Sequence, residues 1–248
     1  MMRWALVLIL LLGACAPTPR PPWPVLPPAE QLLARMEAQS GEYRSLDAAA
    51  RVGVTLGDKY LASQQFILLQ RPDRLRLDAL TGFGQLILQL ASDGERLTAL
   101  LNDSVPPKFL AGQASQANIS RLTRIPLAVD DLIALLLYDP PLVPWRSSRV
   151  EQQSEAVVLV LESFGERQEL LFDRTLRLIG CRYYRQGELW LAVEYAKFAQ
   201  DSGFPRQIEL ELPGEQTEVK LKISELRLNP VIDPQKFRLQ QPDNAIVE

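Results

Sequence analysis

Side chains able to carry covalent chemistry are scarce in this sequence, which contains no histidine. Without imidazole, neither a Ser-His-Asp triad nor a Cys-His pair can be built, and the commonest zinc ligand is missing. Asp130 and Asp131 are neighbours that point apart on an expected helix, and Glu209 and Glu211 follow the solvent side of an expected strand. The sequence also lacks a Gly-x-Ser-x-Gly motif, a phosphate loop and a dinucleotide fingerprint. We therefore expect no catalytic residues, no enzyme activity, no metal and no cofactor.

The residue best placed for a covalent modification is Cys15. Arg3 precedes the apolar residues 4–12, a segment too short to span a bilayer, which needs about 20 residues. The sequence Leu12-Gly13-Ala14-Cys15 resembles the bacterial lipobox. This resemblance implies that residues 1–14 are a lipoprotein signal peptide and that Cys15 carries an N-acyl diacylglycerol. The alternative is an ordinary signal peptide followed by an accidental cysteine.

A proline-rich stretch follows Cys15. Residues 16–28 contain seven prolines, a composition that favours extended polyproline II structure and a semi-rigid spacer. At about 3.1 Å per residue, this spacer would hold a domain about 40 Å from the lipid. We expect residues 15–28 to form a lipidated tether and residues 29–248 to form one domain.

Charge and cysteine content narrow the functional class further. Lysine and arginine total 27 against 30 aspartates and glutamates, and the net charge is −3. The arginines are scattered, so no basic stripe predicts binding to nucleic acid. If Cys15 is acylated, Cys181 has no intramolecular disulfide partner, and we expect it to be a buried apolar residue.

Alternation of apolar and polar residues dominates the chain and predicts β-strands. Because the strands alternate rather than running uniformly apolar, the sheet should be antiparallel, with one face covered and the other exposed to water. The expected strands are residues 46–56, 59–70, 74–78, 86–90, 96–101, 156–162, 167–172, 176–184, 189–198, 208–212 and 219–223.

Helical spacing of apolar residues appears in two places. Residues 29–38 form one expected helix. Residues 126–138 form another, with Pro126 in its first turn, and its apolar residues lie nearly all round, so it should be buried or cover an apolar surface. Residues 104–118 are polar and look irregular, and residues 119–124 suggest a short helical piece.

These elements predict a mainly β (α+β) fold. The expectation is a single strongly curved antiparallel sheet, an unclosed β-barrel of about 11 strands covered by helices. A two-sheet sandwich is the competing architecture, but it would not need residues 126–138 as a lid.

The order of the elements resembles that of the LolA/LolB superfamily of bacterial outer-membrane lipoprotein-sorting proteins. The resemblance rests on the lipobox, the strand pair between residues 75 and 90, and Asn229-Pro230 followed by Asp233 and Phe237-Arg238-Leu239. LolB-like lipoproteins are the most similar members. The resemblance implies an apolar interior that receives lipoprotein acyl chains or lipid, with a periplasmic LolA-like carrier as a partner. By the sorting rule of enteric bacteria, Ala16 after the lipidated cysteine implies anchoring in the outer membrane, with the domain in the periplasm.

Site residues also follow from the resemblance. In LolB-like proteins, a loop between two early strands exposes a large apolar residue that helps to deliver cargo into the bilayer. The matching residue here is Phe83, where that family usually has leucine; the alternative is a phenylalanine tucked into a turn. The same positions that would contact acyl chains could instead form an ordinary filled core. The expected acyl-binding residues are Leu75, Leu77, Leu86, Leu88, Leu90, Ile133, Leu136, Ile208 and Leu210.

The function implied is that of an outer-membrane lipoprotein that binds acyl chains and receives or inserts lipoproteins or lipids. No reaction is required, because an acyl chain has a similar free energy in a dry apolar cavity and in a bilayer. The alternative is an outer-membrane interaction lipoprotein that uses the same fold as a scaffold for a protein partner.

Overall fold

The computed structural model describes Trp23, residues 25–123 and residues 125–247. The predicted signal peptide and Cys15 lie outside these residues. Among the described residues, no helix is both long enough and apolar enough to cross a membrane.

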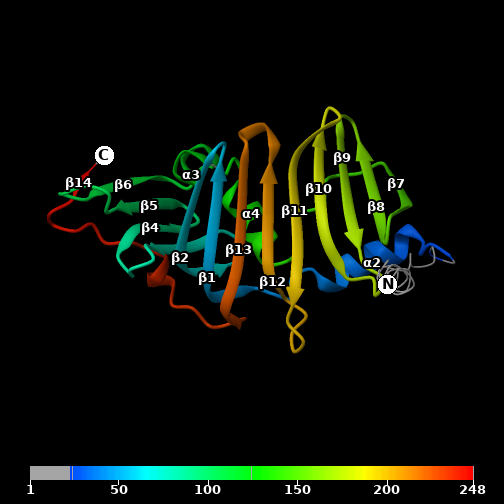
Figure 1. Ribbon diagram of the computed structural model, residues 1–248, viewed down its shortest axis with the longest axis horizontal. Coiled ribbons are helices and arrows are strands. Elements are labelled where there is room, and N and C mark those ends of the chain that lie inside the picture. The colour runs from blue at the N-terminus through cyan, green and yellow to red at the C-terminus, as the bar shows by residue number, and fades with distance from the viewer. Residues whose placement is uncertain (1–22, 24, 124, 248) are drawn as a thin grey trace, which may run out of the picture.

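One sheet of 14 strands makes up most of the described chain (Figure 1). From edge to edge its order is β14-β6-β5-β4-β3-β2-β1-β13-β12-β11-β10-β9-β8-β7. Neighbouring strands are antiparallel, except that β14 pairs with β6 in parallel. Because β14 and β7 each have one strand neighbour, the sheet does not close, and the predicted curved, unclosed sheet is confirmed. The strands are β1 (Ser45–Leu56), β2 (Lys59–Gln70), β3 (Arg74–Leu80), β4 (Leu86–Asp93), β5 (Arg96–Leu101), β6 (Lys108–Gln113), β7 (Ser147–Gln153), β8 (Ala156–Ser163), β9 (Glu166–Phe172), β10 (Leu178–Arg185), β11 (Glu188–Phe198), β12 (Pro205–Leu212), β13 (Thr217–Leu228) and β14 (Ile246–Val247).

Three of these strands were not predicted from the sequence. The strand β6 lies in the stretch expected to be irregular, and β7 and β14 form the two edges of the sheet. Six of the seven residues of β7 are exposed. The strand therefore lacks the alternation of apolar and polar residues that marks a half-buried strand. The strand β14 has only two residues and pairs through its backbone.

Three α-helices are described: α2 (Ala29–Gln39), α3 (Gln116–Thr123) and α4 (Val129–Leu136), together with short 3-10 turns at Pro213–Glu215 and Pro234–Phe237. The helix α4 is shorter than predicted. Ala128 has extended dihedral angles (φ −66°, ψ 155°), so Pro126 does not occupy the first turn. At the other end, the helix ends at Leu136, and Tyr138, two residues further on, adopts a positive φ of 60°.

The helix α4 lies against one face of the sheet, which we call the inner face. Side chains alternate between the two faces of each strand, and residues paired across neighbouring strands share a face. Leu46, Leu69 and Leu75 are paired in this way across β1, β2 and β3, and all three are buried on the inner face. The same alternation continues to the far edge, where the inner residues of β8 are Val157, Leu159 and Leu161.

The curvature coincides with irregular pairing. Register shifts occur in β1 next to Ala49, in β3 next to Ala79 and twice in β10, and such bulges bend and twist a strand. At one of them, a Cβ on Gly180 would approach the carbonyl oxygen of Val193 to 2.8 Å. Glycine is therefore required where β10 and β11 come this close.

The chain after β13 crosses the outer face. Phe237 is 1% exposed and lines a hollow there with Thr98 and Phe109. The guanidinium of Arg238 lies 2.8 Å from the carboxylate of Asp93 at the end of β4. The outer face of β4 to β6 is thus covered by the C-terminal segment, while α4 covers the inner face of the sheet.

Candidate lipid-binding site

The helix α4 has a composition that suits burial rather than a surface position. Of its eight residues, Val129, Leu132, Ile133, Ala134, Leu135 and Leu136 are buried. Asp130 and Asp131 lie in the first turn, where carboxylates interact favourably with the positive end of the helix dipole. The helix therefore places apolar side chains on the inner face and its two charges at one end.

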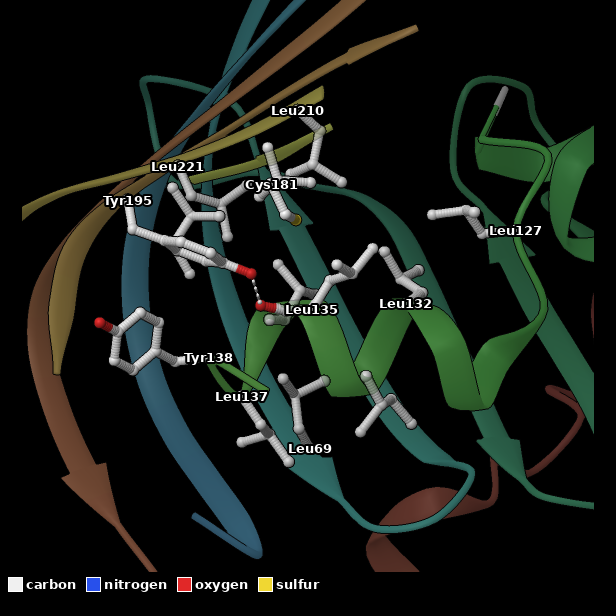
Figure 2. Close-up of a cluster of buried hydrophobic side chains, with 14 of the residues drawn as sticks. Leu69, Leu127, Leu132, Leu135, Leu137, Tyr138, Cys181, Tyr195, Leu210 and Leu221 are labelled. Atoms are coloured by element: carbon white, nitrogen blue, oxygen red, sulfur yellow. Dashed lines mark hydrogen bonds between the residues drawn. The ribbon is translucent and has the colours of Figure 1, made fainter. Parts of the chain in front are cut away.

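Figure 2 shows the apolar cluster that surrounds α4. Leu69, Leu210 and Leu221 reach toward the helix from three strands of the inner face, and all are buried in the core. The Tyr195 hydroxyl donates a hydrogen bond of 3.0 Å to the carbonyl oxygen of Leu135. Burial raises the pKa of Tyr195 well above its ordinary value, so this hydroxyl remains a hydrogen-bond donor.

The nine expected acyl-binding residues all lie in the strands or helix that form this layer. Leu75, Leu90, Ile133, Leu136, Ile208 and Leu210 are buried in the core cluster, and Leu77 and Leu88 pack against it while partly exposed. Leu86, beside the register shift between β3 and β4, is also partly exposed. The structure thus brings seven of these residues to the inner face of the sheet, and Ile133 and Leu136 belong to α4, which packs against that face. Whether they contact an acyl chain stays a prediction.

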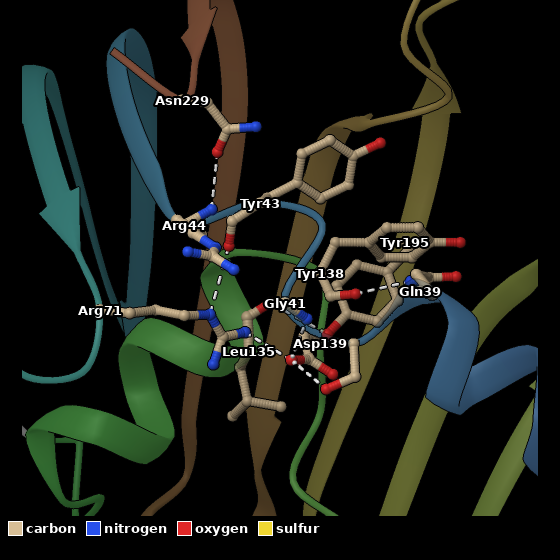
Figure 3. Close-up of polar contacts among 11 residues, drawn as sticks. Gln39, Gly41, Tyr43, Arg44, Arg71, Leu135, Tyr138, Asp139, Tyr195 and Asn229 are labelled. Carbon is tan, nitrogen blue, oxygen red and sulfur yellow. Dashed lines mark hydrogen bonds and ion pairs between the residues drawn. The ribbon is translucent and has the colours of Figure 1, made fainter. Parts of the chain in front are cut away.

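The C-terminal end of α4 is fixed by polar contacts (Figure 3). One carboxylate oxygen of Asp139 lies 2.6 Å from the Arg71 guanidinium, accepts a hydrogen bond of 3.1 Å from Ser40 and another of 3.3 Å from the Gly41 amide. The Gln39 side chain donates a hydrogen bond of 2.7 Å to the Tyr138 carbonyl. These contacts join the end of α4 to the corner between α2 and β1 and to the turn after β2.

Buried contacts of Tyr138 also fix the C-terminal end of α4. The Tyr138 hydroxyl donates a hydrogen bond of 2.7 Å to the carbonyl of Leu178, and burial raises the pKa of Tyr138 above its ordinary value. The Tyr138 ring packs edge-on against Tyr195, with ring centroids 4.9 Å apart. Such an aromatic pair contributes about 0.5–1.5 kcal/mol beyond the burial of its area.

The N-terminal end of α4 is held differently. Ala128, before the helix, offers no side-chain cap. Along one side of the helix lies a hollow of about 210 Å³, lined by Asp131 and Leu135 of α4 and by the segment 141–144 and the β10–β11 hairpin. Burial, and then the neighbouring charge of Asp130, raise the pKa of Asp131, while Arg185 opposes the shift. The helix is thus fixed by polar contacts at its C-terminal end and borders a hollow along one side.

Sequence reasoning did not identify Arg71, Asp139 or the hollow beside Asp131. The contact between Arg71 and Asp139 joins positions 68 residues apart, and a single sequence carries no signal for such a pairing. An acidic residue after an apolar helix was the only available hint.

Phe83 lies in the turn between β3 and β4 and is 97% exposed. It is therefore not tucked into the turn. Its expected role in delivering cargo to a bilayer remains a prediction.

Cys181 is fully buried in the core cluster beneath α4, as predicted. Burial raises the pKa of its thiol to about 12, so the thiol is protonated and unreactive at neutral pH. Across residues 23 and 25–247, leaving out position 124, no group of three His, Cys, Asp or Glu side chains is placed to hold a metal ion.

An unclosed curved sheet with helices against its inner face is the architecture of LolA/LolB-like proteins, and the chain has this fold. It matches a putative outer membrane lipoprotein-sorting protein domain from Vibrio parahaemolyticus with a TM-score of 0.55 and 13% identity, covering 85% of this chain and 97% of that one. It also matches a LolA superfamily protein from Nitrosomonas europaea with a TM-score of 0.56 and 15% identity, covering 86% and 99%.

A DUF1329 family protein from Desulfovibrio piger has the same fold, with a TM-score of 0.53 and 15% identity over 85% of this chain and 95% of that one. No family model matches the sequence, and no curated protein matches it in sequence. The similarity therefore lies in the fold.

Proposed function

We propose that this protein is a lipid-anchored protein of the bacterial outer membrane that binds acyl chains between α4 and the inner face of the sheet. It receives or inserts lipoproteins or lipids at the membrane and forms no covalent intermediate with them. Cys15 carries the anchor, the domain lies in the periplasm, and a LolA-like carrier is the partner that supplies cargo. The names of the similar folds, an outer membrane lipoprotein-sorting domain and a LolA superfamily protein, support this proposal.

The observation that carries the proposal is the position of α4. Its leucines occupy the inner face as a short apolar chain would. Burying one leucine side chain contributes about 1.5–3 kcal/mol and burying one methylene about 0.8 kcal/mol, so about two to four methylenes offset one displaced leucine. Acyl chains and α4 therefore compete for the same surface on nearly equal terms, and the exchange requires no reaction.

The proposal is tested by identifying bound ligand. The protein is secreted with Cys15→Ala, purified without detergent, and examined by native mass spectrometry. We expect an acylated ligand in this protein and its loss in Leu88→Glu, because the added carboxylate faces the inner surface. Leu88 is partly exposed, so the variant should fold. Ile87→Glu is the matched control, because Ile87 is the preceding residue of β4, points to the outer face and is 38% exposed.

A second candidate function is a scaffold for a protein partner. The packed inner face and the exposed side chains of Phe83 and Val105 favour it. An empty protein in every preparation, together with loss of a protein partner on Phe83→Ser, would support the scaffold and contradict the carrier.

A further inference from the structure

Three aromatic residues and two arginines lie in or next to the lining of the hollow beside α4: Arg185 and Trp190 line it, and the other three are close in sequence to its lining residues Pro144 and Glu166. We call Trp145, Arg146, Phe164, Arg185 and Trp190 the aromatic rim. Arg146 stacks over the Phe164 ring at 3.8 Å, and Arg185 stacks over the Trp190 ring at 4.0 Å. These residues come from three separate parts of the chain: the segment before β7, the β8–β9 turn and the β10–β11 hairpin.

Hydrogen bonds hold those turns together. The Arg146 amide donates a hydrogen bond of 2.8 Å to the Glu162 carbonyl, and the Gln186 amide donates one of 2.7 Å to the Gly165 carbonyl. The segment before β7, the β8–β9 turn and the β10–β11 turn are therefore neighbours. Phe164 is 76% exposed and Trp145 is 42% exposed, so the rim presents apolar surface to its surroundings.

The hollow is lined by apolar and charged side chains. Its apolar lining includes Leu127, Leu135, Leu142, Val143 and Leu191. Charged side chains of both signs, Arg185, Asp131 and Glu166, also line it, and Arg185 pairs across strands with Glu166. Its volume of about 210 Å³ lies below the roughly 300–1,000 Å³ of sites for drug-sized ligands, which suits part of a single hydrocarbon chain.

We propose that the aromatic rim docks on the bilayer surface and that the hollow admits one acyl chain of a bilayer phospholipid to the space beside α4. The proposal rests on the function proposed above and names the route and the ligand class. Tryptophan and arginine beside an exposed phenylalanine suit a membrane interface, where the rings sit at the headgroup level and arginine reaches the phosphates. The charges of both signs that line the hollow suit a zwitterionic headgroup that carries both a phosphate and an ammonium group.

The attachment of the tether is compatible with this orientation. The Trp23 amide donates a hydrogen bond to the Gln152 side chain, and the Trp23 indole donates one to the Glu155 carbonyl. Trp23 thus lies at the β7–β8 turn, and the eight residues of β8 (Ala156–Ser163) separate it from Phe164 by about 26 Å. The eight residue steps from Cys15 to Trp23 (23 − 15) reach about 28 Å when extended, so a lipid on Cys15 can lie level with the rim.

The position of the hollow along one side of α4 gives the route its consequence. The C-terminal end of the helix is fixed by Asp139 and its partners. A chain that enters beside Asp131 and Leu135 therefore lies along the side of α4, whose N-terminal end has no side-chain cap.

Photo-crosslinking in vesicles tests the proposal. The full-length lipidated protein carries benzoylphenylalanine at Val143, inside the hollow, or at Val231, a fully exposed control position. It is reconstituted into vesicles of phosphatidylethanolamine and phosphatidylcholine. We expect crosslinks to phospholipid acyl chains from Val143 at about tenfold the yield from Val231, because an apolar contact of about 1.4 kcal/mol corresponds to a factor of ten. Equal yields would overturn the proposal.

A rim variant adds a second readout. Trp145→Ser with Phe164→Ser should lower the Val143 crosslink about tenfold, while Tyr60→Ser, which removes an aromatic side chain of β2 that is 66% exposed, should leave it unchanged. A tenfold loss with Tyr60→Ser, or crosslinks from Val143 to a protein, would contradict the rim as the docking surface. If native mass spectrometry finds bound acyl ligand but Val143 does not crosslink to lipid, the route fails and the proposed function stands. If no ligand is ever bound but Val143 crosslinks to acyl chains, docking stands and the carrier function fails.

Discussion

The thiol of Cys181 lies under α4 with no exposed surface. In the Cys15→Ala protein it is the only thiol, since the sequence has two cysteines. We expect no reaction of the folded protein with a maleimide at pH 7, because burial holds the thiol pKa at about 12, and full labelling in denaturant. Rapid labelling under native conditions, measured by mass spectrometry, would show that the layer between α4 and the sheet is open.

A second residue-scale prediction concerns the pair formed by Arg71 and Asp139, whose side chains are 27% and 15% exposed. Because both are partly buried and share further hydrogen bonds, a double-mutant cycle with Arg71→Gln and Asp139→Asn should give a coupling free energy of unfolding of about 1–2 kcal/mol. The exposed pair of Arg149 and Glu162 is the control, with a smaller expected coupling because solvent screens exposed charges. Equal couplings would mean that Asp139 does not anchor α4.

At the scale of elements, the turn after β4 joins the sheet to the C-terminal segment through Asp93. Its carboxylate accepts a hydrogen bond of 2.8 Å from the Arg96 amide and one of 3.1 Å from the Glu95 amide. These bonds, and the Arg238 guanidinium, hold the pKa of Asp93 below its ordinary value of 3.8. The folded protein therefore binds fewer protons here than the unfolded chain.

The direction of the Asp93 pKa shift determines how the stability of the protein depends on pH. Asp93 contributes stability above pH 3.8, and that contribution is lost as the pH falls through the lowered pKa of the folded state. Asp93→Asn should lower the free energy of unfolding by about 1–2 kcal/mol at pH 7, and the difference from the unchanged protein should vanish in acid. Asp103→Asn, on the exposed turn after β5, is the control for urea denaturation measured over this pH range. A difference that persists in acid would contradict the carboxylate role.

Strands with one buried face could be predicted from the sequence, and strands without one could not. The predicted residues 208–212 and 219–223 lie within β12 and β13, because buried apolar residues alternate there with glutamates and lysines. The edge strand β7 has no buried residue and therefore no apolar pattern. The alternation of apolar and polar residues also predicted that Leu88 and Leu210 lie on the covered face of the sheet. The surroundings of Trp190 and Asp139 depend on contacts between distant segments of the chain, which this alternation does not predict.

At the scale of the whole molecule, anchoring depends on a residue outside the described part of the chain. Cys15→Ala should move the protein from the membrane fraction to the soluble periplasmic fraction and abolish labelling with radioactive palmitate, because two or more acyl chains hold a protein stably on a bilayer. Ala14→Ser, which keeps a small residue before the cysteine, is the control. Membrane association that survives Cys15→Ala would mean that the rim or another surface, not the lipid, holds the protein.

The central claim is that acyl chains and α4 compete for the inner face. Hydrogen–deuterium exchange of residues 129–136, followed with and without a saturating acylated ligand, tests it most directly. We predict faster exchange in α4 when the ligand is bound, with unchanged exchange in the neighbouring strands β1 and β13. Unchanged exchange in α4 together with new protection on the outer face would contradict the account.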